Sequence, residues 1–519
     1  MALPKLVEDL LQPEAYPHRP ARIDLVQTHI SYVFLAGDLV YKIKKPVDFG
    51  FLDFTTLEKR KFFCEREVEL NRRLCPEIYL GVVPVVEKGG RYVFEGAGEA
   101  CEWAVKMKRL PEEGMMGRLI AEGRLSERHL DLLVEKLVPF YQTAATGPEV
   151  NRYGTLEAIS FNVEENFTQT RDFVGQALAE HRYQHIVTWS RRFMDENKAL
   201  FDTRIEGGFI RDGHGDLYSA NVCYPAEDRV CVFDCIEFND RFRCGDVAQD
   251  LAFMAMDLDY HRLRTLSQYF IERYVELSQD RGLLEVLDFY KCYRAYVRGK
   301  IGCFTWASKE VDEKSRQRSL EAARRYFDLA YLYAGGEPFL IVIFGLSGTG
   351  KSTLARALSR RLLANYYNSD VVRKRLLEIP PEEHRYEPFG QGIYREEITQ
   401  KTYQAMVQYA VQDLSEGRDV ILDATFRSRA LRALVLEAIQ KLPCRLLFVE
   451  CQAPEDVIRK RFQERAQKTG EPSDGRWEIY LKQKEVFEAP EEIPKEKLLI
   501  LETTRPVEEL IEEVLVRLL

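Results

Sequence analysis

The stretch FLIVIFGLSGTGKST, residues 339–353, decides the fold of the C-terminal part of the chain. Its apolar beginning favours a buried β-strand, and the glycine-rich run that follows fits the pattern G-x-x-x-x-G-K-[ST]. The next residues, TLARALSRRL, have the spacing of a helix. In a loop between a strand and a helix, glycines let backbone N–H groups turn inward around phosphate oxygens, and the helix N-terminus adds its positive end. The sequence therefore predicts a phosphate-binding loop.

The residue types in this loop indicate a nucleotide with a magnesium ion. Lys351 is expected to reach the β- and γ-phosphates, and the Ser352 hydroxyl is expected to bind Mg²⁺. We therefore expect ATP and Mg²⁺ as cofactors. The residues expected to hold them in this loop are Gly345, Ser347, Gly348, Thr349, Gly350, Lys351, Ser352 and Thr353.

A change in composition just before the loop marks a domain boundary. The segment YLYAGGEP, residues 331–338, places Gly-Gly and Pro between a basic helical segment and the strand, so we put the boundary near residue 336. Downstream, short apolar strands alternate with helical segments. The expected strands are FLIVIF at 339–344, DVILD at 419–423, RLLFVE at 445–450 and LLILE at 498–502. This alternation predicts that residues 336–519 form an α/β domain with a parallel sheet.

Acidic residues at strand ends are candidates for catalysis and metal binding. Asp370 closes NYYNSD, at the sheet edge where ligands bind in such folds, although it could instead only cap the next helix. Arg373 lies one helical turn further on and could hold an anionic group of the acceptor. Asp423 ends VILD and could hold a Mg²⁺ water, or could be a polar strand end without a role.

Arginines in the helical run VIRKRFQERAQK are candidates for a lid. Arg461 and Arg465 are four residues apart and share a helix face. Guanidinium groups neutralise charge on the oxygens of a transferring phosphoryl group, so these two side chains could close over it. A solvated basic face is the alternative for either of them.

The motifs GLSGTGKS, NSDVVRKRL and VILDATF, with Arg461 and Arg465, resemble the P-loop kinases. This group includes polynucleotide 5′-hydroxyl kinases, zeta-toxin-like kinases and gluconate-kinase-like enzymes, and the resemblance covers most of residues 338–519. It implies that Asp370 acts as general base on the acceptor hydroxyl and that Arg373 clamps a neighbouring phosphate of the acceptor. The spacing of this acid and arginine is less specific than the loop, and it leaves the acceptor open.

The first part of the chain, residues 1–335, is expected to contain two lobes. Residues 25–110 have the pattern of strands with one strong helix, LEKRKFFCEREVELNRRL, which predicts a small α+β lobe. Residues 111–335 are mostly helical, apart from a turn-rich stretch at 209–250.

Two lysines of the small lobe are candidates for contacting phosphates. In LVYKIKK, strand alternation puts Lys42 and Lys44 on one face. We expect Lys42 to point at the nucleotide, with Lys44 as the alternative. Glu67, on the predicted helix, is the expected ion-pair partner.

The string HGDLYSAN places an acid and an amide five residues apart, as Asp216 and Asn221. Phosphoryl transfer to a hydroxyl needs a carboxylate that accepts the hydroxyl proton and an amide oxygen that holds Mg²⁺, and one loop can supply both. The apolar strand RVCVFD then ends in Asp234, the expected second metal ligand. Glu237 follows three residues later and is the alternative ligand.

Two further acids, Asp246 and Asp250 in GDVAQDLA, are expected to brace the catalytic loop by accepting backbone N–H bonds. HGDLYSAN, the strand-end Asp234 and GDVAQDLA together resemble the aminoglycoside phosphotransferase family, which implies a protein-kinase-like fold over about residues 25–330. The small lobe departs from protein kinases, because THISYVFLAGD contains no G-x-G-x-x-G, a motif that the aminoglycoside enzymes also lack. This family phosphorylates several kinds of hydroxyl compound, so it implies no single substrate.

Length and composition agree with a multidomain globular protein. The chain has 519 residues, of which 45% are hydrophobic and 30% charged, so at least two domains are expected. The net charge of −9 offers no general attraction to nucleic acid. Residues 339–519 contain 28 basic and 29 acidic side chains, a difference of −1, so that domain has no basic excess either.

The sequence also predicts a location. Its apolar runs fall well short of the roughly 20 residues that a membrane-spanning helix needs, and its N-terminus lacks the pattern of a signal peptide. We therefore expect a cytoplasmic protein without a membrane partner. The 11 cysteines are an odd number without a C-x-x-C pair, and reduced thiols are expected.

The whole chain resembles bacterial bifunctional proteins that join an aminoglycoside-phosphotransferase-like domain to a P-loop kinase domain. The leading hypothesis is an ATP-dependent phosphotransferase with two sites, each of which phosphorylates a hydroxyl of a small molecule. One alternative is a C-terminal polynucleotide 5′-hydroxyl kinase that acts in nucleic-acid repair. Another alternative is a regulatory scaffold that senses nucleotides. Neither the acceptors nor the oligomeric state can be read from the residues.

Overall fold

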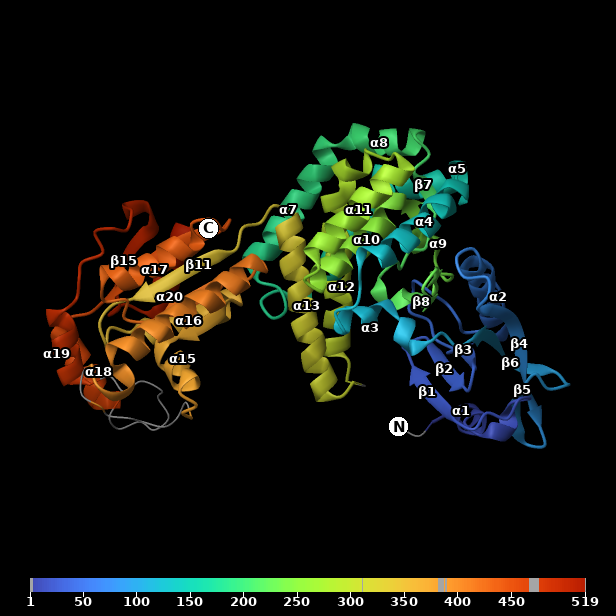
Figure 1. Cartoon of the computed structure of the whole chain (residues 1–519), viewed down its shortest axis with the longest axis horizontal. Coiled ribbons are helices and arrows are strands. Elements are labelled where there is room, and N and C mark those ends of the chain that lie inside the picture. The colour runs from blue at the N-terminus through green and yellow to red at the C-terminus, as the bar shows by residue number, and fades with distance from the viewer. Residues whose placement is uncertain (1–2, 310, 381–386, 388–389, 466–475, 519) are drawn as a thin grey trace. The chain divides into compact units, whose positions relative to one another are not determined.

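The fold is known from a computed structural model that describes residues 3–309, 311–380, 387, 390–465 and 476–518. The chain divides into two compact units, whose elements are labelled in Figure 1. Unit 1 comprises Met1–Glu165 and Arg191–Ala295, and unit 2 comprises Asn166–Ser190 and Tyr296–Leu519. Each unit therefore draws on two separate stretches of sequence.

Unit 2 contains a five-stranded sheet with the order β12-β13-β11-β14-β15. All neighbouring strands in it are parallel. The strands are β11 (Phe339–Phe344), β12 (Asn365–Asn368), β13 (Val420–Asp423), β14 (Arg445–Gln452) and β15 (Leu498–Glu502). The prediction of a C-terminal α/β domain with a parallel sheet is confirmed.

The central strand β11 explains why the sheet is covered on both faces. Every residue of β11 is buried, and alternate side chains of a strand point to opposite faces. Phe339, Ile341 and Ile343 pack with residues of α14 (Lys351–Leu362) and α20 (Val507–Leu518). The intervening Leu340 and Val342 pack with residues of α16 (Glu396–Ser415) and α17 (Arg429–Ile439). A continuous apolar run is what a strand between two helical layers requires.

The other helices of unit 2 follow in chain order. They are α13 (Glu313–Tyr333), α15 (Ser369–Leu376), α18 (Glu455–Arg465) and α19 (Trp477–Glu485). In Figure 1 the strands of this unit run from yellow to red, with α16 and α20 beside them. The carboxyl ends of the parallel strands share one edge, where ligands bind in folds of this kind.

Unit 1 begins with a six-stranded antiparallel sheet whose order is β1-β2-β3-β6-β4-β5. The strands are β1 (Ile23–Gln27), β2 (Ser31–Ala36), β3 (Leu39–Lys44), β4 (Tyr79–Lys88), β5 (Arg91–Phe94) and β6 (Ala100–Lys108). Helix α2 (Leu57–Arg72) packs Cys64 and Val68 against Tyr79 and Val105 of the sheet. A small lobe of strands with one strong helix is therefore present, and α1 (Lys5–Leu10) and β1 extend it beyond the sequence prediction.

The rest of unit 1 is mainly helical, with four short strands. The helices are α3 (Met116–Ala121), α4 (Glu127–Thr143), α5 (Pro148–Asn151), α8 (Lys198–Glu206), α9 (Asp240–Arg243), α10 (Val247–Tyr260) and α11 (Arg264–Ser278). Strand β7 (Ile210–Asp212) pairs with β10 (Cys244–Asp246), and β8 (Val222–Ala226) pairs with β9 (Arg229–Val232). The turn-rich stretch at 209–250 thus forms two small two-stranded sheets, and the HGDLYSAN segment connects β7 to β8.

The limits of the units differ from the boundary that we placed near residue 336. They fall within three helices, namely α6 (Leu156–Thr170), α7 (Glu180–Glu196) and α12 (Leu283–Ala307). Residues 166–190 and 296–335 precede the predicted boundary but belong to the same compact unit as the parallel sheet. The composition break at 336 marks the start of β11 and is not a limit of a compact unit.

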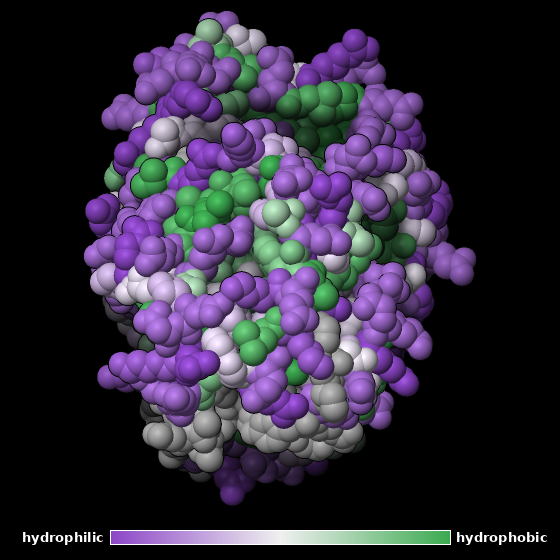
Figure 2. All heavy atoms as spheres, turned by 90° about the vertical axis from the view of Figure 1, so that its left-hand side faces the viewer, coloured by the Kyte–Doolittle hydropathy of each residue, from purple (hydrophilic) through white to green (hydrophobic). Residues whose placement is uncertain are grey.

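The surface in Figure 2 is mostly polar. This view faces the side that lies at the left of Figure 1, and hydrophilic residues surround separate apolar patches on it. Among the helices of the described residues, we find none with both the length and the apolar character needed to cross a bilayer.

Candidate functional sites

The glycine-rich loop between β11 and α14 has a backbone conformation that favours glycine. Gly348 and Gly350 have φ angles of +83° and +88°. A Cβ atom on Gly348 would lie 2.8 Å from Ile458 Cγ2, and one on Gly350 would lie 3.1 Å from Thr503 Oγ1. The loop packs closely against neighbouring elements because these positions lack side chains. This backbone fits the cradle that a phosphate group requires.

Lys351 and Ser352 begin the helix that follows the loop. Helix α14 starts at Lys351, directly after the left-handed Gly350. The Lys351 ammonium donates a hydrogen bond to the Leu346 carbonyl at 2.7 Å, so it lies across the loop. The positive end of the helix dipole and the lysine charge therefore act on the same small region, which suits an anion such as a nucleotide phosphate.

Arg461 of α18 connects the loop to the last strand of the sheet. Its guanidinium donates to Gly348 O at 3.3 Å and to Thr503 O at 2.6 Å. Thr503, which follows β15, donates from its hydroxyl to Thr349 O at 2.6 Å. Thr503 is a residue that the sequence analysis missed, because nothing near it in the sequence marks it as a neighbour of the loop.

A second residue that the sequence analysis missed is Gln483 of α19. The backbone N–H of Ser347 donates to Gln483 Oε1 at 2.9 Å, so this side chain holds one loop residue from outside the motif. Arg465 was expected to act with Arg461, but its side chain lies outside the described residues. Its role as a lid residue stays a prediction.

Asp423 lies at the carboxyl edge of the sheet, as expected for a strand-end acid. It ends β13 in register with Ile343 of β11, and only 1% of its surface is exposed. Its carboxylate accepts hydrogen bonds from Tyr366 Oη and Asn368 Nδ2, both at 2.7 Å. These neutral donors orient the carboxylate beside the loop, where it could hold a water of Mg²⁺.

Asp370 and Arg373 lie together at the start of α15. Asn368 caps this helix by accepting from the Asp370 and Val371 N–H groups, so the alternative that Asp370 is the cap is wrong. The Arg373 guanidinium donates to Asp370 Oδ1 at 2.7 Å and lies 4.6 Å from the Tyr394 ring centre. Arg373 is 5% exposed, and its Nε has no hydrogen-bond partner among the described atoms. The pair thus combines a carboxylate with a guanidinium whose Nε could donate one more hydrogen bond to an anionic oxygen.

In unit 1, Lys42 of β3 contacts two carboxylates from distant parts of the chain. Its Nζ donates to Glu67 Oε1 at 2.9 Å and to Asp234 Oδ1 at 2.7 Å. Glu67 comes from α2, and Asp234 follows β9. The Asp234 side chain is 47% exposed and that of Lys42 is 13% exposed, so this pair reaches the solvent. The structure thus brings together three of the residues singled out in the sequence.

The charges of this cluster support one another. Burial acts to lower the pKa of Lys42, but the charges of Asp234 and Glu67 outweigh it and raise that pKa well above the ordinary value. Burial acts to raise the pKa of Asp234, but the charge of Lys42 outweighs it and lowers that pKa. Both groups are therefore charged at neutral pH.

Asp216 and Asn221 face each other across the HGDLYSAN turn. Asn221 Nδ2 donates to Asp216 Oδ2 at 3.0 Å and to the Asp216 carbonyl at 2.9 Å. Because the amide nitrogen points to Asp216, the amide oxygen points away from it, as ligation of a metal would require. The carboxylate is fixed on one side by this contact.

Asp250 of α10 braces the same loop. It accepts hydrogen bonds from the His214 N–H at 2.7 Å and from the Gly215 N–H at 2.9 Å. The Tyr141 hydroxyl also donates to it, at 3.0 Å. Asp246 accepts from the Ala248 N–H as the cap of α10. Asp250 therefore braces the loop as expected, whereas Asp246 caps its own helix and accepts hydrogen bonds from the buried Arg204.

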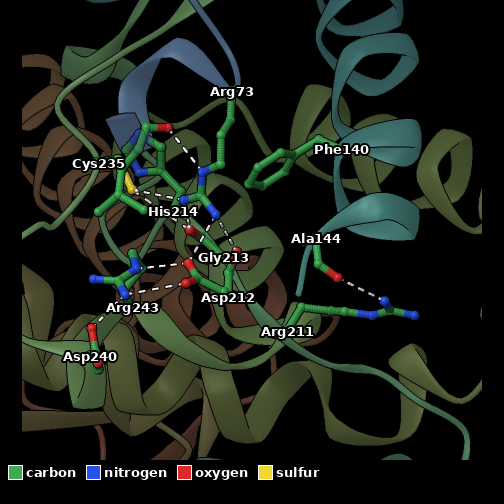
Figure 3. A network of polar contacts seen from close by, with 12 residues as sticks. Arg73, Phe140, Ala144, Arg211, Asp212, Gly213, His214, Cys235, Asp240 and Arg243 are labelled. Carbon is green, nitrogen blue, oxygen red and sulfur yellow. Dashed lines mark hydrogen bonds and ion pairs between the residues drawn. The ribbon is translucent and has the colours of Figure 1, made fainter. Parts of the chain in front are cut away.

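Arg73, directly after α2, ties the helix that carries Glu67 to the segment before Asp216. Figure 3 shows its guanidinium pointing at Asp212 and Gly213, with Arg243 on the other side of Asp212. Arg73 donates to Asp212 Oδ1 at 2.9 Å and to Gly213 O at 2.8 Å, and Arg243 donates to the same Oδ1 at 2.8 Å. The two arginines hold the pKa of Asp212 below its usual value although burial acts to raise it. This network fixes the end of α2 against the segment that leads into the HGDLYSAN turn.

A disulfide connects the same regions. Cys75, which follows α2, is bonded to Cys231 of β9, with Cα atoms 5.1 Å apart. The expectation that the cysteines are all reduced is wrong for this pair. The two residues are 156 positions apart in sequence, and only the fold of unit 1 brings them together.

The residues present fit a nucleotide with a divalent cation at both sites. Among the described residues, no three of the side chains of His, Cys, Asp and Glu gather so that they could hold a metal ion by themselves. A hard cation held by one or two protein oxygens together with phosphate oxygens is the usual arrangement for Mg²⁺. Asn221 and Asp234 could supply such oxygens in unit 1, and Ser352 and Asp423 could do so in unit 2.

Comparison with known proteins agrees with the P-loop geometry. The family described as "AAA domain" matches residues 340–490, which include the loop, Asp370 and Asp423. This region is therefore a P-loop nucleotide-binding domain.

The chain as a whole matches curated relatives from mycobacteria. It is 31% identical over 458 residues to "Uncharacterized protein Rv2004c" of Mycobacterium tuberculosis, which covers 88% of each chain. "Uncharacterized protein Mb2027c" of Mycobacterium bovis matches with the same identity and coverage. The chain belongs to the family of these proteins. An alignment of this length exceeds residues 336–519 alone, so the family shares both parts of the chain.

Several solved structures that are similar to about a third of the chain are kinases by their names. A sugar kinase from Janibacter sp. HTCC2649 is 20% identical, covers 34% of this chain and 93% of its own, and has a TM-score of 0.26. A gluconokinase from Sinorhizobium meliloti 1021 is 19% identical, with 35% and 91% coverage and a TM-score of 0.26. The APS kinase CysC of Mycobacterium tuberculosis is 19% identical, with 35% and 97% coverage and the same TM-score.

Proposed function

We propose that the protein is an ATP-dependent phosphotransferase with two nucleotide sites, each of which phosphorylates a hydroxyl group of a small molecule. The observation that carries this proposal is the contact of Lys42 with both Glu67 and Asp234 in unit 1, and unit 2 separately contains a complete phosphate-binding loop. Bound Mg-ATP would supply the phosphoryl group at each site.

At the first site, in unit 1, each singled-out side chain has one task. Lys42 provides a positive charge for phosphate oxygens, and Glu67 holds its ammonium in place. Asp234 and Asn221 provide the oxygens for a cation. Asp216 accepts the proton of the acceptor hydroxyl, and its carboxylate is oriented by the Asn221 amide.

At the second site, in unit 2, the loop backbone and Lys351 bind phosphate oxygens. Asp370 accepts the proton of the acceptor hydroxyl, and Arg373, which contacts it, binds an anionic group of the acceptor. Arg461 holds the loop through Gly348 and Thr503. A charge balance of 28 basic and 29 acidic residues over 339–519 favours a small acceptor over a polynucleotide.

The proposal is tested by counting nucleotides on the full chain. Calorimetric titration with a non-hydrolysable ATP analogue and Mg²⁺ should give two per chain. Lys351→Ala and Lys42→Met should each reduce the number to one, and the double variant should bind none. A value of one for the unaltered chain would contradict the two-site proposal. Transfer of ³²P from ATP to a small-molecule extract, lost in the double variant, would establish the reaction.

A further inference from the structure

A second buried ion pair lies directly inside the Lys42 cluster. The Lys44 ammonium donates to Glu67 Oε2 at 2.7 Å and also to Glu237 Oε1. The side chains of Lys44, Glu67 and Glu237 are 0%, 1% and 5% exposed. These charges therefore have almost no contact with solvent, in contrast to the half-exposed Asp234.

The cluster consists of two neighbouring ion pairs, which we call rungs. Lys42 with Asp234 is the outer rung, and Lys44 with Glu237 is the inner rung. Lys42 and Lys44 are two residues apart on one face of β3, about 7 Å along a strand. Lys42 contacts Asp234, and Lys44 contacts Glu237, which follows Asp234 by three residues. Glu67 joins the two rungs, because its Oε1 contacts Lys42 and its Oε2 contacts Lys44. The outer rung reaches the solvent where a nucleotide would bind, whereas the inner rung is closed off.

The inner charges are held by their mutual contacts. A buried charge is tolerated only when it is paired, and removal of one partner leaves the other uncompensated. The cluster contains two lysines and three carboxylates, a formal sum of −1. Loss of Lys44 would leave Lys42 as the only lysine among three carboxylates and would draw its ammonium away from a phosphate.

We propose that Lys44 and Glu237 are positioning residues of the first nucleotide site, which fix Glu67 and the segment after Asp234 so that the outer rung is correctly spaced. This inference rests on the proposed function of that site. It removes Glu237 from the candidate metal ligands and Lys44 from the candidate phosphate contacts. The two residues act on the nucleotide through Glu67, Lys42 and Asp234.

The test uses the full chain with Lys351→Ala, so that only the first site binds the probe, a fluorescent N-methylanthraniloyl ATP with Mg²⁺. Thermal unfolding is measured in parallel without nucleotide. The matched control is Arg60→Met, which breaks another buried pair of α2, Arg60 with Glu102, whose side chains are 10% and 8% exposed. That pair has no contact with Lys42 among the interactions of the described residues.

We expect Lys44→Met to raise the dissociation constant of the probe by about tenfold or more, and Arg60→Met to lower the unfolding temperature without changing that constant. Lys44→Met with Glu237→Met should regain thermal stability, because two apolar side chains replace a buried ion pair, but should not regain affinity. Glu237→Gln is the milder variant if Lys44→Met does not fold, and it should weaken binding several-fold.

Two results would overturn the inference. One is a normal affinity in Lys44→Met and Glu237→Gln, which would make the inner pair a purely structural contact. The other is a loss of Mn²⁺ binding in Glu237→Gln as large as that in Asp234→Asn, which would make Glu237 a metal ligand. Failure of the proposed function is distinct, since then the parent chain with Lys351→Ala would bind no probe at all.

Discussion

The two candidate sites hold their functional groups in different ways. In unit 1, Lys42 and Asp234 are 192 residues apart and are oriented by ion pairs between side chains. In unit 2, most of the phosphate site is one continuous loop. Lys351 and Arg461 are held by backbone carbonyls and Asp423 by neutral donors, although Asp370 and Arg373 also form an ion pair. In a site made of paired charges, a substitution that weakens binding should also lower the stability of the fold. In a site made of backbone groups, a substitution can weaken binding with little effect on stability.

The largest expected effect is for Asp216, the proposed general base of the first site. Asp216→Asn, in the full chain with Lys351→Ala, should reduce phosphoryl transfer by about 10²–10⁴-fold, because a positioned general base contributes that much. Nucleotide affinity should change little, since the ion-paired groups that hold the nucleotide are intact. Transfer of ³²P to a small-molecule extract and fluorescent nucleotide binding measure the two effects. An unchanged rate would place the base elsewhere.

The corresponding change at the second site is Lys351→Ala. Turnover there should fall by about 10²–10³-fold, the usual loss when one charge-stabilising group is removed. The first site should keep its nucleotide, because the charge of this lysine acts locally. Nucleotide turnover and stoichiometry are measured on the full chain, with Lys42→Met as the reciprocal variant. Loss of both sites from either change would contradict the independence of the two regions.

Stability measurements test the comparison directly. Lys42→Met should lower the free energy of unfolding by about 1–3 kcal/mol, less than the loss for a fully buried pair because Asp234 is half exposed. Lys351→Ala should lower it by less. Denaturant unfolding of both full-chain variants without nucleotide measures the difference. Equal losses would mean that the backbone cradle also depends on its lysine for folding.

A smaller effect is expected for the acceptor of the second site. With only a few cations near Asp370, the apparent acceptor affinity should depend weakly on salt, and Arg373→Ala should weaken it by about tenfold, the value of one charge-assisted contact. The measurement is acceptor KM against salt concentration in full-chain Lys42→Met. Steeply salt-dependent labelling of a 5′-hydroxyl oligonucleotide, lost in Arg373→Ala, would instead favour a polynucleotide kinase.

The smallest expected effect concerns Asp328, a partly buried acid of unit 2 away from the loop. Burial raises the pKa of Asp328 to about 6, although it is paired with Arg182 at 2.6 Å. Because the folded pKa lies above the unfolded one, near 3.8, this contribution to stability is present below about pH 4 and is lost as the pH rises to 6. The difference in pKa corresponds to at most roughly 3 kcal/mol at pH 7.5. Asp328→Asn also removes the ion pair with Arg182, so it should stabilise the chain at pH 7.5 by about 1 kcal/mol and not at pH 4. Thermal unfolding at both pH values measures this, and an equal effect at both would contradict it.

The sequence analysis succeeded where chemistry is encoded locally. The strand, glycine loop and helix at 339–353 predict the P-loop because their geometry depends on neighbours in the sequence. The strand–helix alternation likewise predicts the parallel sheet. Asp250 was predicted to brace the loop because it lies in the GDVAQDLA string, and it accepts from the His214 and Gly215 N–H groups.

It failed where the partner is distant. Thr503 and Gln483 contact the loop from more than 130 residues away, and neither belongs to a motif. The disulfide of Cys75 and Cys231 joins segments that carry no shared pattern. The choice between Lys42 and Lys44 was also beyond the sequence, because both point to one face and only tertiary packing decides which of them reaches the solvent.

The interleaved sequence of unit 2 has a consequence for the synthesis of the chain. Arg182 of α7 is 3% exposed, and it donates to Asp419, which lies 237 residues further on. At roughly 5–20 residues per second, the ribosome adds Asp419 about 10–50 s after it adds Arg182. During that interval a guanidinium that ends up buried has only water or other partners, so the segment 166–190 cannot complete its packing until the sheet appears. We therefore expect nascent chains halted before residue 419 to be cleaved readily by proteases within 166–190.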